Sequence, residues 1–183
     1  MNLPASVAGR ERQRLFCALR LPEAALDTLA GWAARELHGG RVVPREHLHL
    51  TLAFLGHRPT AELPAIAGAL RDAAAAAASI RLLPERYRET RSVGMLVLKD
   101  PAGAATRLAE DLFGRLERLG VYERERRAWL PHVTVLRFRR PPRLDPGVPD
   151  LGEVVPSDAA VYLSRLRPSG ADYFVVETSV LGG

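Results

Sequence analysis

Two short stretches of this chain repeat one pattern, and they restrict its fold more than any other feature. Residues 49–52, HLTL, and 132–135, HVTV, each alternate polar and apolar positions, as a strand with one buried face does. Because successive side chains point to opposite faces of a strand, the His and Thr of each stretch share a face. The five His and seven Thr of the chain would give about 0.2 His-x-Thr triplets by chance. We therefore expect two strands whose polar faces line a common cleft.

Two imidazoles and two hydroxyls in one cleft suit the cleavage of a phosphodiester. This reaction needs a base and an acid, and imidazole can serve as either at neutral pH. The hydroxyls of Thr51 and Thr134 can donate to phosphate oxygens, where charge builds up. Arg137 is the nearest cationic candidate, but its strand parity differs from that of His132, so it reaches the cleft only if the strand bulges or ends there. The scheme requires no cofactor, and two His alone leave zinc short of a third protein ligand.

The order of the predicted elements favours an α+β fold with antiparallel sheets, since strands cluster instead of alternating strictly with helices. Helices are predicted over 23–38, 62–79 and 104–120, from apolar periodicity, alanine content and terminal Pro or Gly residues. Strands are predicted over 14–21, 80–88, 93–100, 129–138, 159–166 and 172–180, and within 41–56 after a Pro-centred turn. Each His-x-Thr strand follows a helix, which hints at an internal duplication. The length suits one domain over 1–183, with residues 1–11 as a flexible tail.

Charge and composition narrow the class of partner only slightly. The chain has 26 basic and 21 acidic residues, and every basic residue except Lys99 is Arg. Arg forms forked hydrogen bonds with phosphate and stacks on bases, which suits nucleic acid, although a biased genome composition explains the same excess. No apolar run has the length of a membrane helix, and the first residues lack the apolar core of a signal peptide. We therefore expect a cytoplasmic protein.

Four further side chains have interpretations of their own. His47 has the strand parity of His49 but comes earlier, and we interpret it as a surface or turn histidine. Cys17 lies in an apolar run and is expected in the core. Trp129 is expected in the core or the cleft wall, and Phe16 is a candidate contact for the base of a bound nucleotide.

The longer segments around these residues resemble a known family. They are similar to signatures of the two-histidine phosphoesterase superfamily, and in particular of its RNA 2′,3′-cyclic phosphodiesterase branch, also called 2′-5′ RNA ligase. The similarity is carried by RLFCALRLPEA, VPREHLHLTLAFLG, WLPHVTVLRF and the closing YLSRLRPSGADYFVV. His47 stands where this family frequently has Asn. The resemblance covers residues 12–178.

The resemblance implies a bilobal fold with two pseudo-symmetric lobes, each an antiparallel sheet backed by helices, that face each other across a central cleft. It implies that a monomer hydrolyses the 2′,3′-cyclic phosphate at an RNA 3′ end, such as that of a tRNA fragment, to a 2′-phosphate without a metal. By the family's assignment, His49 donates a proton and His132 accepts one. Thr51, Thr134 and Arg137 would hold the phosphate.

Two alternative functions stay open on this reasoning. The same groups would serve the reverse reaction, in which a cyclic phosphate end joins a 5′-hydroxyl through a 2′-5′ bond, although the high concentration of water favours hydrolysis. A non-catalytic module would bind the RNA end without cleaving it, but binding alone has no need for a matched acid and base. The sequence also leaves open which imidazole is the acid, because the two motifs are nearly equivalent.

Overall fold

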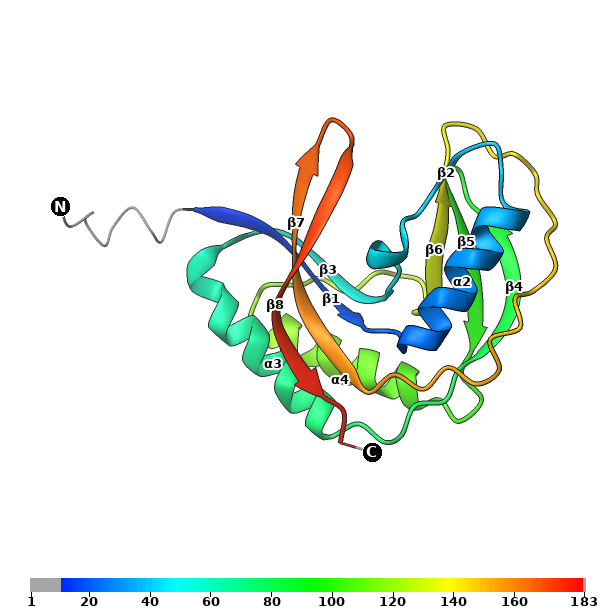
Figure 1. The fold of residues 1–183 in the computed structure, drawn as a ribbon. Helices are drawn as coiled ribbons and strands as arrows, with labels where there is room; N and C mark the ends of the chain where they lie inside the picture. The colour runs from blue at the N-terminus through cyan, green and yellow to red at the C-terminus, as the bar shows by residue number, and fades with distance from the viewer. Residues whose placement is uncertain (1–10, 183) are drawn as a thin grey trace.

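The fold is built mainly from strands that form one strongly curled sheet (Figure 1). The computed structural model describes residues 11–182. Its strands are β1 (Arg12–Leu19), β2 (Arg41–Val42), β3 (Leu50–Pro59), β4 (Leu83–Glu89), β5 (Val93–Lys99), β6 (His132–Arg137), β7 (Asp158–Arg167) and β8 (Gly170–Val180). Its helices are α2 (Glu23–Glu36), α3 (Leu63–Ala75) and α4 (Ala104–Arg118), with short 3-10 helices η1 (Arg45–His47) and η2 (Thr60–Glu62). No helix in this described part is long and apolar enough to cross a membrane.

The predicted helices and strands are all present, and some of their ends differ from the prediction. Helix α3 ends before residue 79 because the carbonyl of Ala74 accepts hydrogen bonds from the backbone N–H groups of Ala77, at 3.1 Å, and Gly182, at 3.0 Å. The predicted tail lies mostly outside the described residues. Its last residue, Glu11, accepts hydrogen bonds from the backbone N–H and the hydroxyl of Thr60, each at 2.9 Å.

The sheet runs in the order β4-β5-β6-β3-β1-β7-β8, with β2 paired to β6, and every pairing is antiparallel. The α+β class with antiparallel strands is therefore confirmed. Between β3 and β6 the register has a single pair, Leu50 with Val133. The two sheets expected from the sequence are thus two groups of strands joined into one sheet at this pair.

The two groups of strands form the two lobes that Figure 1 shows on either side of the molecule. The first lobe contains β1, β3, β7 and β8, backed by α3 and α4. The second contains β2, β4, β5 and β6, and α2 packs there through Trp32, whose ring lies 6.4 Å from that of Tyr87 on β4. Each lobe draws strands from both parts of the sequence, so the lobes are not two consecutive halves of the chain.

Local sequence explains why α4 lies on the sheet. Its buried positions include Leu108, Leu112 and Leu116, which recur at the spacing of one helical face. The carboxylate of Asp100 accepts hydrogen bonds from the backbone N–H of Thr106, at 2.8 Å, and from its hydroxyl, at 2.9 Å, so it satisfies a first-turn donor that the helix leaves free. Gly120, with φ of 68°, ends the segment in a conformation that glycine adopts at little cost.

Candidate active site

The two His-x-Thr stretches meet where the lobes join. Leu50 and Val133 are paired and are 0% and 1% exposed, so both point into the core. Their neighbours in each stretch point to the opposite face, because side chains alternate along a strand. Since the strands are antiparallel, the pair relates the two stretches by an approximate twofold axis. The structure therefore brings the two histidines and two threonines to one face of the sheet.

Backbone carbonyl groups fix both imidazoles in the same way. The Nδ1 atom of His49 lies 2.7 Å from the carbonyl oxygen of His47, and that of His132 lies 2.8 Å from the carbonyl oxygen of Leu130. A carbonyl oxygen only accepts, so each Nδ1 carries the hydrogen and donates it. This leaves Nε2 as the atom of each ring that is available for proton transfer. The acceptor is two residues before the histidine in both motifs, although the sequences there differ.

His49 is neutral in the free protein. The pKa of His49 is lowered to about 4, mainly by burial and in part by the charge of Arg137, against the opposing effect of the hydrogen bond to the His47 carbonyl. The neutral ring has a bare Nε2, which lies 3.1 Å from the hydroxyl oxygen of Thr51. The hydroxyl therefore donates to Nε2 in this state.

Aromatic rings enclose His49 and account for its burial. The ring of Phe16 lies 4.9 Å from that of His49, Tyr173 meets it edge-on at 5.4 Å, and Tyr162 lies at 5.9 Å. Phe16 and Tyr162 also stack on each other at 4.9 Å. Phe16 is 2% exposed. Its ring packs against His49 and leaves little surface for contact with the base of a nucleotide. Tyr173, which belongs to the closing segment that carries part of the family resemblance, faces the cleft.

Arg137 reaches the cleft through a bulge. In the pairing of β5 with β6, Gly94 faces Leu136 and the next residue, Met95, faces Thr134, which makes Val135 the extra residue. Val135 and Leu136 are both fully buried, so the alternation of side chains is reset between them. Arg137 consequently lies on the cleft side. The strand parity of Arg137 had required a bulge for this, and the bulge is present.

Two contacts that the sequence did not reveal hold the first motif in place. The indole N–H of Trp129 donates to the carbonyl of Thr51 at 3.1 Å, so the segment before the second motif is tied to the backbone of the first. Arg45 of η1 forms ion pairs of 2.6 Å with Glu23 and with Asp27 of α2. This anchors the turn that leads into His49, and His47 lies in that turn, as expected.

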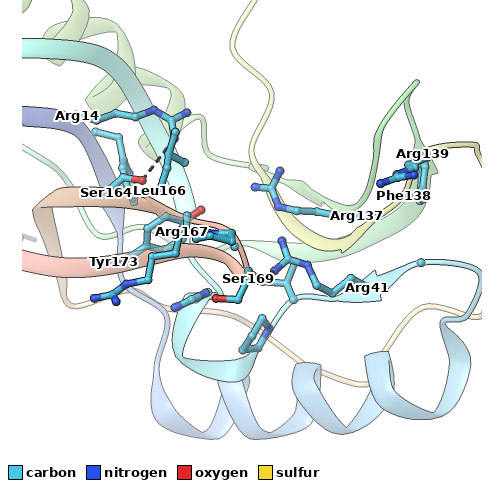
Figure 2. Close-up of a pocket in the computed structure, with 18 of the residues that line it drawn as sticks. Arg14, Arg41, Arg137, Phe138, Arg139, Ser164, Leu166, Arg167, Ser169 and Tyr173 are labelled. Carbon is cyan, nitrogen blue, oxygen red and sulfur yellow. Dashed lines mark hydrogen bonds between the residues drawn. The ribbon is translucent and has the colours of Figure 1, made fainter.

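A cleft of about 1250 Å³ opens between the lobes beside these groups, and Figure 2 shows its lining. Tyr173 and Arg137 both line it, and they connect it to His49. None of the described residues that line it is Asp or Glu, whereas six are arginines. These six are Arg14, Arg41, Arg137, Arg139, Arg140 and Arg167. The cleft is therefore built to attract an anion.

Two of these arginines face each other directly. Arg41 of β2 is paired with Arg137 of β6, and like charges at opposed positions of a sheet repel. Among residues 11–182 neither forms an ion pair. The guanidinium of Arg41 instead donates to the carbonyl of Ser169 at the tip of the β7–β8 hairpin, at 2.9 Å, across the cleft. An anion placed between the two arginines would relieve their repulsion.

Other candidate groups lie outside this constellation. Cys17 is fully buried, as expected, and burial raises the pKa of its thiol to about 12. His38 and His57 are exposed. In the described part of the chain, no three His, Cys, Asp or Glu residues are grouped so that they could hold a metal ion.

A curled antiparallel sheet with two His-x-Thr stretches on one face is the arrangement of a two-histidine phosphoesterase. Within that class, the chain belongs to the 2′-5′ RNA ligase superfamily, whose family model matches residues 21–167. It is 35% identical over 188 residues to an RNA 2′,3′-cyclic phosphodiesterase of Thermus thermophilus, an alignment that covers 93% of this chain and 91% of that protein. It is 32% identical over 133 residues to an RNA 2′,3′-cyclic phosphodiesterase of Escherichia coli, covering 69% and 73%.

Solved structures agree with this assignment. A crystal structure of a Thermus thermophilus protein, 31% identical, has a TM-score of 0.78 and covers 93% of this chain and 98% of its own. The Escherichia coli protein LigT in its apo form has a TM-score of 0.82, with coverage of 94% and 99%. At 24% identity this second likeness shows the fold alone.

Proposed function

We propose that the protein hydrolyses the 2′,3′-cyclic phosphate at an RNA 3′ end to a 2′-phosphate, without a metal. The observation that carries the proposal is the pair of imidazoles that each donate Nδ1–H to a backbone carbonyl and share one face of the sheet. Such a pair provides an acid and a base on either side of one phosphorus. The names of the Thermus and Escherichia relatives support the same reaction.

The proposed step breaks one phosphorus–oxygen bond and forms another. Nε2 of His132 takes a proton from water as the water oxygen attacks phosphorus. The bond from phosphorus to the 3′ oxygen breaks, and Nε2 of His49 gives a proton to that oxygen. The product carries a 2′-phosphate and a free 3′-hydroxyl, and each ring is left in the state opposite to the one in which it began.

The acid role of His49 needs the phosphate itself. The free protein keeps His49 neutral, and an anion held close to the ring favours its charged form. Once Nε2 carries a proton, the hydroxyl of Thr51 no longer donates to it and can donate to a phosphate oxygen. Binding of the anion would therefore charge the acid and free a hydrogen-bond donor at the same time.

The remaining phosphate contacts follow from position. Thr134 occupies the place of Thr51 on the second strand. Arg137 lies close enough to His49 for its charge to act on that ring. These donors are aimed at oxygens on which charge develops in the transition state.

RNA is the proposed partner because the cleft is cationic and far larger than a phosphate. The structures of LigT with ATP and with NADP+, each 25% identical to this chain, show that a related protein holds nucleotides. Both His-x-Thr pairs come from one chain, which supports action as a monomer. The end of a tRNA fragment is one source of such a substrate.

The test is incubation in EDTA with an oligonucleotide that ends in a 2′,3′-cyclic phosphate. Formation of a 2′-phosphate end is the expected result, and H49A and H132A should each lower the rate by about a hundredfold or more. Full activity of either variant would refute the assignment of that histidine. If a 5′-hydroxyl strand is added and a 2′-5′ linked product forms instead, the protein is a ligase. Binding without turnover would make it an RNA-end-binding module.

A further inference from the structure

The cleft face of the first lobe has a second polar position, away from the two histidines. On β1 this face carries Ala18, Phe16 and Arg14 in alternation. Ala18 is paired with Thr51 of the first motif, and Phe16 is the ring beneath His49. Arg14 comes next along the strand and also lines the cleft.

Arg14 is too far along β1 to serve the phosphate held at Thr51. Ala18 lies four positions further along the strand, which corresponds to about 13 Å at the rise of a strand. Its side chain does not turn back along the strand but crosses to β7, where its guanidinium lies 3.4 Å from the hydroxyl oxygen of Ser164 (Figure 2). Arg14 and Ser164 are also directly paired in the sheet.

This pair has free capacity for an anion. Ser164 is only 6% exposed, and its hydroxyl accepts from Arg14, so its own hydrogen remains available to another acceptor. Among residues 11–182 Arg14 forms no ion pair, whereas Arg167, on the same wall of the cleft, is paired with Asp172. A guanidinium and a hydroxyl side by side match two oxygens of a phosphodiester.

An aromatic side chain lies next to both polar positions. Tyr173 is paired with Ser164 in the β7–β8 register, and its ring lies 5.4 Å from that of His49. Tyr173 therefore connects the two positions, since its backbone is paired with Ser164 and its ring lies beside His49. A nucleoside whose 3′ end lies at the histidines would have this ring beside it, and Arg14 is a cation with no ion pair among residues 11–182 that could bind the phosphate on its 5′ side.

We propose that Arg14 and Ser164 form a second phosphate subsite, which binds the phosphodiester on the 5′ side of the terminal nucleotide. The proposal rests on the proposed function and adds a requirement to it. The preferred substrate is an RNA strand with at least one internal phosphodiester, and a nucleoside 2′,3′-cyclic phosphate is a poor one. Arg14 acts there on specificity and not on the reacting atoms.

The experiment compares two dinucleotides that end in a 2′,3′-cyclic phosphate. One has a normal phosphodiester between its nucleosides, and the other has an uncharged methylphosphonate at that place. For the unaltered protein, we expect kcat/KM to be at least tenfold higher for the phosphodiester. For R14Q and S164A the ratio should fall toward one, most completely for R14Q. Thermal melts of both variants check that they are folded.

Arg118, exposed at the end of α4 and not in the lining of the cleft, provides the matched control. R118Q removes the same charge and should keep the full preference. Equal hydrolysis of the two dinucleotides by the unaltered protein, or an unchanged ratio in R14Q, would overturn the subsite while leaving the proposed function intact. If neither dinucleotide is hydrolysed, the proposed function fails. In that case the binding affinities of the two dinucleotides are measured by calorimetry for the same variants. Tighter binding of the phosphodiester that is lost in R14Q supports the subsite, and equal binding overturns it.

Discussion

Neutral His49 should make the stability of the protein depend on pH in a way that can be measured. The pKa of the ring is about 4 in the folded protein and about 6.5 in an unfolded chain. Between these values the unfolded state binds one proton more than the folded state, so stability rises with pH. The contribution is complete above pH 6.5 and is lost as the pH falls through 4.

The expected size follows from the two pKa values. A difference of one pKa unit corresponds to about 1.4 kcal/mol, so the stability that His49 contributes changes by about 3 kcal/mol between pH 7 and pH 4. The ring packs against Phe16, Tyr162 and Tyr173, but His49 is only half-buried, so solvent screening makes this value an upper limit.

Urea unfolding at several pH values provides the assay. H49Q has no titrating ring, so the unaltered protein should lose about 3 kcal/mol more than H49Q when the pH falls from 7 to 4. H38Q removes an exposed histidine at the end of α2 and should behave as the unaltered protein does. Inorganic phosphate should raise the folded pKa of His49 and flatten the difference. Parallel pH curves for the unaltered protein and H49Q would show that the ring is not buried in its neutral form.

Three further changes test the cleft. W129F removes the donor to the Thr51 carbonyl and should cost about 2 kcal/mol, a fall of roughly 4–8 °C in Tm by calorimetry, and no fall would mean that the contact is not made. R137Q should lower kcat by tenfold or more and change KM less, because the charge acts on the transition state; steady-state kinetics that show only a KM effect would contradict this. RNA affinity measured by fluorescence anisotropy should fall as the salt concentration rises. A plot of the logarithm of the binding constant against that of the salt concentration should have a slope approaching about −4 if all six cleft arginines contact phosphates. A slope near zero would show that these arginines do not contact the RNA phosphates.

The alternation of His49 with Thr51, and of His132 with Thr134, was enough to predict which side chains share a face. The structure places them so because each stretch is a strand with one buried face, which is a local property. Helix positions were predicted for the same reason, since apolar spacing and terminal glycines are also local. The end of α3 was missed because a hydrogen bond from Gly182, more than a hundred residues later, helps to determine it.

Other features of the site depend on contacts that no local pattern encodes. The bulge at Val135 exists only in the pairing of β6 with β5, and it decides whether Arg137 faces the cleft. Arg14, Arg41 and Arg167 are distant in the sequence and gather only when the sheet curls. The rings around His49 come from three separate strands, β1, β7 and β8. The residues next to His49 in the sequence therefore could not predict that its ring is neutral or that Phe16 is buried.

The single register pair that joins the lobes has a mechanical consequence. Leu50 and Val133 connect the two groups of strands, and each lies next to one of the two histidines in the sequence. The sheet can flex most easily where only one pair holds it. A hinge motion about this pair that widens the entrance for RNA would also move one imidazole away from the other. The open protein would then admit RNA but could not catalyse the reaction. The two imidazoles would return to the distance that the reaction needs only when the lobes close on the RNA strand.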